Sequence, residues 1–454
     1  QPIPSSNDEY GTAAAYMARL IYSYKQRYLL TASVRRDAYS AFGDDFKWGT
    51  FPAVALGWEF TKEPWFKASW LNYGKLRLSY GVNGNRDIGR YVALSNLQTG
   101  KYFHVGKDGT VESVSEIYVE NMANPKLQWE RTAAYNLGLD FNLFHGILTG
   151  SIDAYKSKTT DLLVKRSLPD IIGSNYIWTN LGQIDNKGLE FNLSSKNIDH
   201  PDFSWNSSFN FSLNRNKIAS LYGDMQDVMD ADGNVIGQKE PDDIENGWFI
   251  GRALDAIWDY KVLGVYQENE LEQANKYGQQ PGDFKIEDVN GDGKYTNEDK
   301  QFLGFKNPRF VWSLRNEFTF LKHFNLSFML YSHIGQMAQY NQAKNNSGFI
   351  DRSSYYDLPY WTPVNPINNY ARLFSSDGGA SYSVWRKQSF VRLANISLAY
   401  SFPKDLIKKA QIQDLRVYFT VRNAAVYAPD WDYWDPEYSG PSPRTYTLGL
   451  NITL

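Results

Sequence analysis

Period-two alternation of apolar and polar residues runs along most of this chain and constrains its fold more than any other feature. Residues 75–82 (KLRLSYGV) place Leu76 and Leu78 on one side of an extended backbone, and Arg77 and Ser79 on the other. Every second residue from position 446 to position 454 is likewise apolar. Successive side chains of a strand point to opposite faces. The sequence therefore predicts an all-β protein whose strands have one apolar, aromatic face and one polar or charged face.

The lengths of the strands and of their connections favour a membrane barrel. Many alternating runs extend over about 10–13 residues, which matches a tilted strand that crosses a bilayer. Short turns on one side and long loops on the other are the layout of an outer-membrane barrel, and this pattern predicts about fourteen antiparallel transmembrane strands. Short reversals are expected at residues 23–28, 141–148 and 318–326, and long extracellular loops at residues 83–125, 215–247, 259–307 and 335–386.

The composition agrees with this interpretation and excludes several classes of function. There is no cysteine, the five histidines are scattered, and no nucleophile motif occurs, so we expect no catalytic residue and no enzyme. A net charge of -3 argues against nucleic acid as a partner. Aromatic residues make up 16% of the chain, and rings at strand ends form the girdles of a membrane barrel. The expected strand-end rings are Tyr22, Tyr24, Trp48, Phe51, Trp58, Phe60, Trp129, Phe141, Phe144, Phe318, Phe320 and Phe324.

Several stretches resemble the SusC/RagA-type TonB-dependent transporters of the bacterial outer membrane. They follow the family's order and cover nearly the whole chain. Residues 27–60 resemble the family's segment of two barrel strands around an arginine–aspartate turn, and residues 443–454 (PRTYTLGLNITL) resemble its final strand. The other matching stretches are LNYGKLRLSYGVNGN (71–85), DVNGDGKYTNEDKQFLG (288–304), FVRLANISLAYSFPK (390–404), LRVYFTVRNAAV (415–426) and WDPEYSG (434–440).

The chain departs from the family at both ends. Nothing in it resembles the plug domain or the amino-terminal motif that TonB pulls, and no signal peptide opens it. Large transporters of this kind have about 22 strands. We therefore interpret residues 1–454 as the carboxy-terminal portion of a TonB-dependent transporter barrel, with the plug domain absent from this chain. The last residue is Leu454, where the family more often ends in an aromatic residue.

The resemblance implies TonB-dependent import of an oligomeric nutrient across the outer membrane, by a barrel surrounded by outer-membrane lipid. It implies a SusD-like surface lipoprotein as a partner, and the TonB complex acting through the missing amino-terminal part. A glycan is the expected substrate, and a peptide is the alternative. A second class of protein stays open, namely a secreted, calcium-stabilised β-protein that binds carbohydrate. Its sheets would carry polar residues on both faces.

Residues 288–299 (DVNGDGKYTNED) have the ligand spacing of an EF-hand calcium loop, with Gly293 at the position of the sharp turn. We expect calcium here as a structural cofactor in an extracellular loop insert that spans residues 259–307. The alternative is a metal-free turn, because Asp, Asn and Gly favour turns by themselves. The predicted ligands are Asp288, Asn290, Asp292, Lys294, Thr296 and Asp299, with Lys294 contributing its backbone carbonyl.

Two loops rich in aromatic residues are candidates for substrate binding. They span residues 351–374 and 428–440, and their rings are suited to stacking on a sugar or clamping a peptide. The alternative is that the rings only pack the loops together. The candidate residues are Tyr355, Tyr356, Tyr360, Trp361, Tyr370, Trp431 and Trp434.

Overall fold

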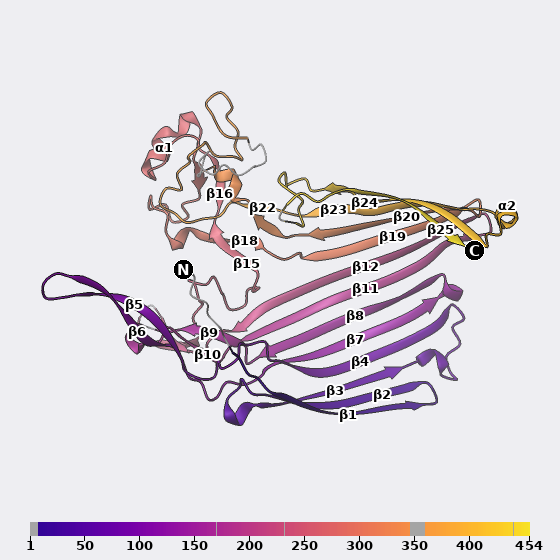
Figure 1. Cartoon of the computed structure of the whole chain (residues 1–454), viewed down its shortest axis with the longest axis horizontal. Coiled ribbons are helices and arrows are strands. Elements are labelled where there is room, and N and C mark those ends of the chain that lie inside the picture. Colours follow the sequence, from indigo (N-terminus) through magenta and orange to yellow (C-terminus); the bar gives the residue numbers. More distant parts are fainter. Residues whose placement is uncertain (1–7, 169, 231, 346–358, 439) are drawn as a thin grey trace. The chain divides into compact units, whose positions relative to one another are not determined.

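A sheet of 13 strands is the main element of the computed structural model, which describes residues 8–168, 170–230, 232–345, 359–438 and 440–454 (Figure 1). The all-β prediction is confirmed. The 13 strands of the sheet come close to the predicted number of about fourteen transmembrane strands. In spatial order the strands are β1 (Ala13–Tyr24), β2 (Tyr28–Tyr39), β3 (Trp48–Trp58), β4 (Leu71–Asn85), β7 (Glu130–Leu143), β8 (Leu148–Thr160), β11 (Gln183–His200), β12 (Phe203–Ser220), β19 (Phe310–Phe320), β20 (Phe324–Ile334), β23 (Phe390–Ser401), β24 (Asp414–Tyr427) and β25 (Thr445–Thr453).

The long connections between these strands contain small sheets of their own, which the alternation pattern does not reveal. One has four strands in the order β5 (Asn96–Val105), β6 (Val111–Met122), β10 (Tyr176–Asn180) and β9 (Leu163–Ser167). The two-stranded sheets are β13 (Gln226–Met229) with β14 (Val235–Lys239), β15 (Ala256–Tyr260) with β18 (Lys300–Phe305), β16 (Val262–Val265) with β17 (Phe284–Ile286), and β21 (Met337–Gln339) with β22 (Trp385–Lys387).

Helices are few and short. In the part of the chain that the structure describes, the α-helices are α1 (Leu271–Lys276) and α2 (Lys404–Ile407). Within the described residues, no helix is long and apolar enough to cross a membrane. The 3-10 helices are η1 (Asp44–Phe46), η2 (Phe60–Lys62), η3 (Phe144–Gly146), η4 (Asp170–Ile172), η5 (Glu268–Glu270), η6 (Asn297–Asp299), η7 (Asn341–Lys344) and η8 (Lys408–Ala410).

The chain divides into two compact units, and each has its own part of the sheet. Unit 1 comprises residues 1–145, 149–189 and 215–252. In its strands β1 to β4 and β7, the register aligns apolar residues into one lateral row across five strands. Most side chains of this row are about half exposed, so no second layer of protein covers them. The row consists of Tyr22, Leu30, Leu56, Leu78 and Leu137.

Unit 2 comprises residues 146–148, 190–214 and 253–454. An apolar row crosses its strands β19, β20, β23, β24 and β25 through Phe318, Leu326, Leu398, Phe419 and Leu448. The next position along each strand belongs to the opposite face, and a polar row crosses there. That row consists of Glu317, Ser327, Ser397, Thr420 and Thr447.

The three predicted short reversals are present, and two of them share one backbone geometry. Lys25 and Gln26 have φ of 51° and 56° between β1 and β2, and Leu321 and Lys322 have 51° and 62° between β19 and β20. Two successive left-handed residues are the mark of a type I′ turn, whose twist matches that of the flanking strands. None of these residues forms the Asn-Gly pair that is typical of such a turn. The turns were therefore predictable from the strand pattern on either side and not from the turn sequence.

Two expectations about unit 1 are wrong. The Arg35–Asp37 stretch lies inside β2 and is not a turn, because the backbone stays extended to Tyr39 and reverses only afterwards. Phe51 and Trp129 are not exposed girdle rings. Both are buried in a core cluster formed where the ends of β3 and β7 meet the adjoining loops, and Trp129 donates its Nε1–H to the Lys47 carbonyl at 3.0 Å.

Candidate functional site

Three connections of unit 2 fold together into one body with an apolar core, which we call the loop module (residues 256–305, 337–345, 359–387 and 431–433). Its fully buried side chains include Tyr266, Tyr340 and Phe284. The β24–β25 connection joins the module because the rings of Trp431 and Tyr433 pack edge-on against Tyr340, at 5.2 and 5.4 Å between ring centroids. Segments that are far apart in the sequence are therefore fixed to one another by a common core.

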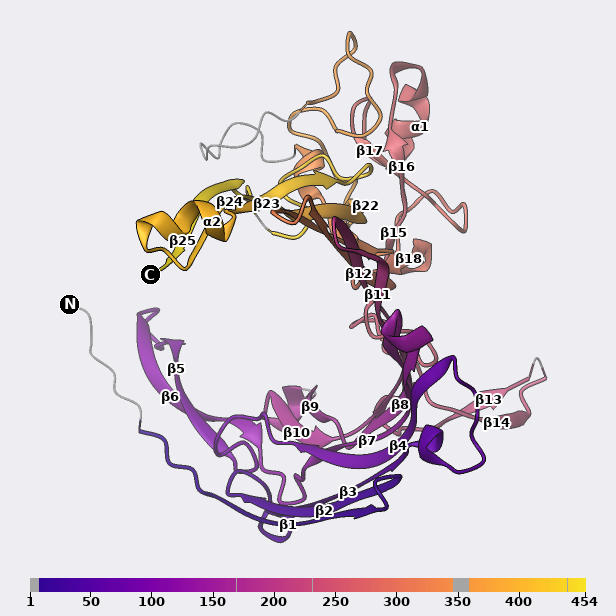
Figure 2. The ribbon, with the colours of Figure 1, turned by 90° about the vertical axis from the view of Figure 1, so that its right-hand side faces the viewer.

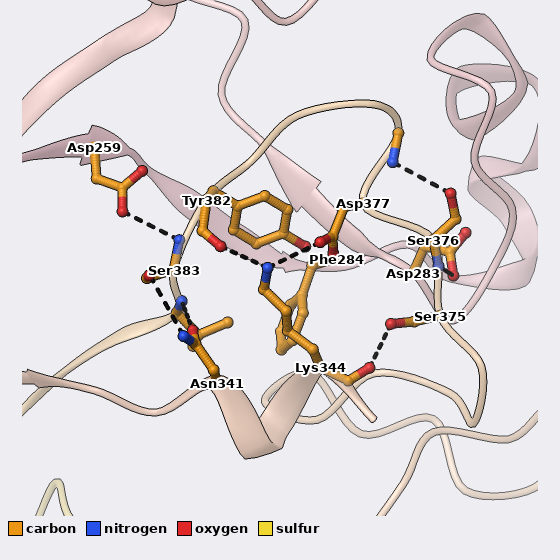
Figure 3. Close-up of polar contacts among 12 residues, drawn as sticks. Asp259, Asp283, Phe284, Asn341, Lys344, Ser375, Ser376, Asp377, Tyr382 and Ser383 are labelled. Atoms are coloured by element: carbon orange, nitrogen blue, oxygen red, sulfur yellow. Dashed lines mark hydrogen bonds and ion pairs between the residues drawn. The ribbon is translucent and has the colours of Figure 1, made fainter. Parts of the chain in front are cut away.

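Polar contacts reinforce this core, and Figure 3 shows the central one. The Nζ of Lys344 lies 3.0 Å from Asp377 Oδ2 and donates to the Tyr382 carbonyl at 2.5 Å, and the lysine side chain is almost completely buried. The fully buried Asp283 is paired with Arg372 at 2.8 Å. The Lys344–Asp377 pair joins two distant parts of one connection, and the Asp283–Arg372 pair joins two different connections. These contacts therefore hold the module together and also satisfy buried charge.

The structure describes five of the seven predicted substrate-binding residues and places them in different surroundings. Trp361 and Tyr370 are only 6% and 3% exposed and belong to the core of the loop module. Trp361 donates to Gln267 Oε1 at 3.0 Å. Tyr360 is exposed, whereas Tyr355 and Tyr356 lie outside the described residues. Trp431 and Trp434 are brought together at one cavity.

This cavity, the aromatic pocket, measures about 380 Å³ and is formed by the β24–β25 connection over the end of β24. It combines ring faces with hydrogen-bonding groups, which is the make-up of a site for small polar ligands. Sequence reasoning named the two tryptophans but missed the polar residues. The lining residues are Asn423, Ala425, Val426, Ala428, Trp431, Tyr433, Trp434, Asp435, Pro436, Ser442 and Arg444.

A buried arginine holds the pocket together. Arg392 on β23 is 3% exposed and donates to Asn423 on β24 and to Asp435 in the connection. Its Nε also lies 3.4 Å from Glu437. Asn423 has a left-handed backbone (φ 51°) beside a break in the β23–β24 register, and its amide donates to Ser442 Oγ at 2.9 Å. The WDPEYSG motif was recognised in the sequence, but its arginine partner lies 43 residues away, and no local pattern connects the two.

A second hollow of about 530 Å³ lies on the polar face of strands β11, β12, β19 and β20. Glu190, Asn210 and Tyr331 are among the residues that border it. The Tyr331 hydroxyl donates to Glu437. Glu437 is also an ion-pair partner of Arg392, so the second hollow and the aromatic pocket share one chain of polar contacts.

The predicted calcium loop is a tight turn whose acidic side chains accept backbone hydrogen bonds. Asp288 accepts from the N–H of Gly291 at 2.7 Å and from that of Gly293 at 2.9 Å. The bond from Gly293 is the main reason why the pKa of Asp288 lies below its usual value. Asn290 and Asp292 each accept from the residue two positions further on. Both glycines have positive φ, which the turn requires.

Asp299, the last predicted ligand, is fully buried and accepts from the N–H groups of Val289 and Thr296 at 2.9 and 2.8 Å. Among the residues that the structure describes, no group of three or more His, Asp or Glu side chains is arranged to hold a metal ion. A carboxylate offers about four lone-pair sites, so Asp288, Asp292 and Asp299 keep acceptor capacity, and all-oxygen donors are those that calcium prefers. The donor chemistry fits, and calcium stays a prediction.

Comparison with known proteins agrees with the strand pattern. The family model described as TonB dependent receptor-like, beta-barrel, matches residues 1–424. The TonB-dependent receptor SusC of Bacteroides thetaiotaomicron is 31% identical over 98% of this chain and 44% of its own length. The TonB-dependent receptor P3 of Formosa agariphila is 29% identical over 99% of this chain and 46% of its own length.

Among solved structures, the RagAB peptide transporter has the same fold, with a TM-score of 0.75 and 21% identity over 97% of this chain and 48% of its own. The chain thus spans about half the length of the relatives it matches. A receptor family agrees with the expectation that the chain is not an enzyme, and an outer-membrane location explains why the apolar rows are uncovered. The chain belongs to the TonB-dependent receptor β-barrels of the outer membrane and is SusC/RagA-like.

Proposed function

We propose that the full-length protein imports an oligomeric nutrient across the outer membrane, energised by TonB, and that this chain supplies a large part of its barrel wall. The observation that carries the proposal is the pair of parallel rows, apolar and uncovered on one face and polar on the other. Such a wall is soluble only where lipid covers the apolar face. The polar face then lines an aqueous path wide enough for an oligomer in a barrel of the family's size.

The secreted, calcium-stabilised β-protein is the weaker candidate. A secreted sheet protein would cover Leu78, Leu137 and Leu448 with a second layer, or replace them with polar residues. All three are exposed, to 49%, 51% and 76% respectively. At about 25 cal/mol per Å², leaving such rows in water costs far more than any loop contact recovers.

We propose a glycan as the substrate and the aromatic pocket as one of its contact sites. Sugars present flat apolar faces ringed by hydroxyl groups. Trp434 supplies a ring face, while Arg444 supplies donors and Asp435 an acceptor. A peptide with aromatic or apolar side chains is the alternative, because the same rings would receive it. The cavity of about 380 Å³ suits one or two sugar rings at a time.

The partner, by the resemblance to SusC/RagA transporters, is a SusD-like lipoprotein that captures substrate at the cell surface. The loop module supports such an arrangement because its three connections share one core and would respond to a partner as one body. Plug displacement by TonB would follow in the part of the protein that precedes this chain.

Calcium in residues 288–299 would stabilise the loop module. Asp288 already receives a hydrogen bond at 2.8 Å from Tyr277, which follows helix α1, so an ion held by this carboxylate would couple the loop to the module's core. Terbium luminescence sensitised by Tyr277 and Tyr295 would detect the site in the full-length protein. Binding that persists in Asp292→Ala and Asp299→Ala variants would disprove it.

Uptake by the full-length protein tests the proposed function. Cells that lack the endogenous gene would be complemented and supplied with fluorescent oligosaccharides and peptides of graded length. We expect TonB-dependent uptake of the oligosaccharides, and an apparent affinity lowered about tenfold or more by Trp434→Ala. Trp70→Ala, at an exposed ring in the β3–β4 connection, is the matched control and should have no effect. Uptake that needs no TonB, or that is restricted to peptides, would contradict the proposal or its substrate respectively.

A further inference from the structure

Another cavity of the loop module has no role in the function proposed above. Its volume is about 400 Å³, and it lies where five short strands meet. Four of them, β15, β16, β18 and β22, lie close together in Figure 1 and Figure 2, and β21 is the fifth. We call it the bulge cavity. Its lining includes Val262, Phe302, Leu303, Met337 and Trp385.

The bulge cavity lies at an irregularity of the β15–β18 pair. The register shifts between Ile257 and Trp258, and Leu303 is the extra residue on β18. Such a bulge bends its strand and increases the local twist, and bulges are frequent next to active sites. Met337 of β21 lies over Gly304, where an added Cβ would be 2.6 Å from its sulfur. The two small sheets therefore come into close contact at Gly304 and leave space beside Leu303.

Two carboxylates fix the orientation of side chains that line the cavity. The Trp385 Nε1–H donates to Asp259 Oδ2 at 2.8 Å. Gln301 donates to Glu287 Oε2 at 2.7 Å, and the Nζ of Lys261 lies 3.0 Å from the same oxygen. An ammonium group has three donors, and a glutamine amide has two donors and an acceptor, so both keep hydrogen-bonding capacity for a ligand. The cavity thus offers aromatic surface beside polar groups that are already oriented, which reduces the entropy lost on binding.

Strand β22 connects the bulge cavity to the aromatic pocket. Trp385 lines the bulge cavity, and the next residue, Arg386, pairs with Asp432 at 2.7 Å. Asp432 lies between Trp431 and Tyr433, which line the aromatic pocket. The two cavities therefore belong to one body and have a fixed spacing.

We propose that the bulge cavity is a second glycan-binding site, and that one substrate chain occupies it and the aromatic pocket together. A sugar ring would place its apolar face on the indole of Trp385 and its hydroxyl groups near Gln301 and Lys261. A chain that reaches both cavities binds more tightly than a shorter one, because its second contact forms within the same complex. The inference rests on the proposed function, since it takes a glycan as the substrate. It adds a site outside the aromatic pocket and a minimum length for tight binding.

Affinity for oligosaccharides of graded length tests this inference in the detergent-solubilised full-length protein. The probes are the oligosaccharides that the uptake assay identifies. Wild-type affinity should rise about tenfold or more at the length that reaches both cavities. The variant Leu303→Trp, which fills the bulge cavity, should abolish this rise and bind short chains as the wild type does. Gln301→Ala should weaken the binding of long chains only.

The matched control is Leu263→Trp. Leu263 is the extra residue of another bulge of the loop module, between β16 and β17, and is 45% exposed. This variant should keep the rise in affinity with chain length.

The possible failures can be told apart. A rise that persists in Leu303→Trp, or no rise with the wild type, would overturn the inference and leave the proposed uptake intact. An equal loss of affinity for short and long chains in Leu303→Trp would show that the residue acts only through the folding of the module, and the inference would be wrong. Binding restricted to peptides would overturn the glycan proposal and the inference together.

Discussion

The Lys344–Asp377 pair of the loop module gives a sharp test of how the module is held together. The variant Asp377→Asn removes the charge but keeps the shape of the side chain, so the ammonium group of Lys344 stays buried with the Tyr382 carbonyl as its remaining close acceptor. Breaking a buried pair on one side costs about 3–5 kcal/mol. Because Asp377 is 28% exposed and Asn still accepts a hydrogen bond, we expect about 2–3 kcal/mol for local opening of the module.

The double variant Lys344→Met/Asp377→Asn should be more stable than Asp377→Asn alone. Methionine keeps an unbranched apolar chain of similar length and needs no counter-charge, and replacing both members of a buried pair by neutral groups is often nearly neutral. The new losses are the hydrogen bond to the Tyr382 carbonyl, worth about 1 kcal/mol, and the contact of Lys344 Nζ with the face of the Tyr382 ring, 3.8 Å from its centroid. The order of stability is thus wild type, double variant, single variant.

Hydrogen exchange measured by mass spectrometry on the full-length protein tests this order of stability. Exchange of the amides of β21 and β22 should speed up about 30- to 140-fold in the single variant, since each 1.4 kcal/mol is a factor of ten. Amides of β23 and β24 should not change. If the double variant exchanges faster than the single one, the lysine contributes more by its apolar stem than its buried charge costs, and the reasoning is refuted.

Three further outcomes are expected. Leu78→Arg on the apolar row should destabilise the refolded full-length barrel in lipid vesicles by about 2–4 kcal/mol, whereas Ser79→Arg on the opposite face should cost much less. Gly449→Ala should lower the barrel's thermal stability by about 1–3 kcal/mol, because the added Cβ would lie 2.1 Å from the ring of Tyr418. The pKa of Asp288 is lowered in the folded protein, so its stabilisation is present above the unfolded pKa near 4 and is lost as pH falls further; exchange protection of residues 288–299 should decline only below about pH 4.

The strands of the barrel wall were predictable because each one shows its alternating pattern within a short stretch of sequence. Alternation at Leu76, Leu78 and Arg77 requires only that successive strand residues face opposite ways. The short reversals followed from the gaps between alternating runs. The wrong expectations concern residues whose burial depends on tertiary contacts. Phe51 and Trp129 lie near strand ends, as girdle rings do, but the loops after β4 and β6 fold over them, and nothing in the sequence around either residue records that cover.

The aromatic pocket was only partly predictable for the same reason. Trp431 and Trp434 stand out in a loop rich in aromatic residues, whereas Trp361 and Tyr370 have the same local character and lie in a core. The two pairs differ because of a feature outside their own loops. The β23–β24 register breaks where Asn423 has a left-handed conformation, and this break leaves space beside the loop that carries Trp431 and Trp434. The sequence predicts an extracellular insert at residues 259–307, but it does not indicate that two other connections share a core with this segment.

The apolar belt is a property of register rather than of any one strand. Tyr22, Leu30, Leu56, Leu78 and Leu137 come from five strands and lie in one row only because each pairing is in phase. A slip of one residue in a single strand would exchange its two faces. In β4 that slip would place Arg77 toward lipid, at a cost of about 2–4 kcal/mol near the bilayer midplane, and withdraw leucines from it. Phase is set where strands reverse, so the left-handed residues of the short turns fix a belt that extends well beyond them. The long connections of this chain, by contrast, are free to vary in length and content without disturbing the row, and it is there that the loop module and the aromatic pocket are found.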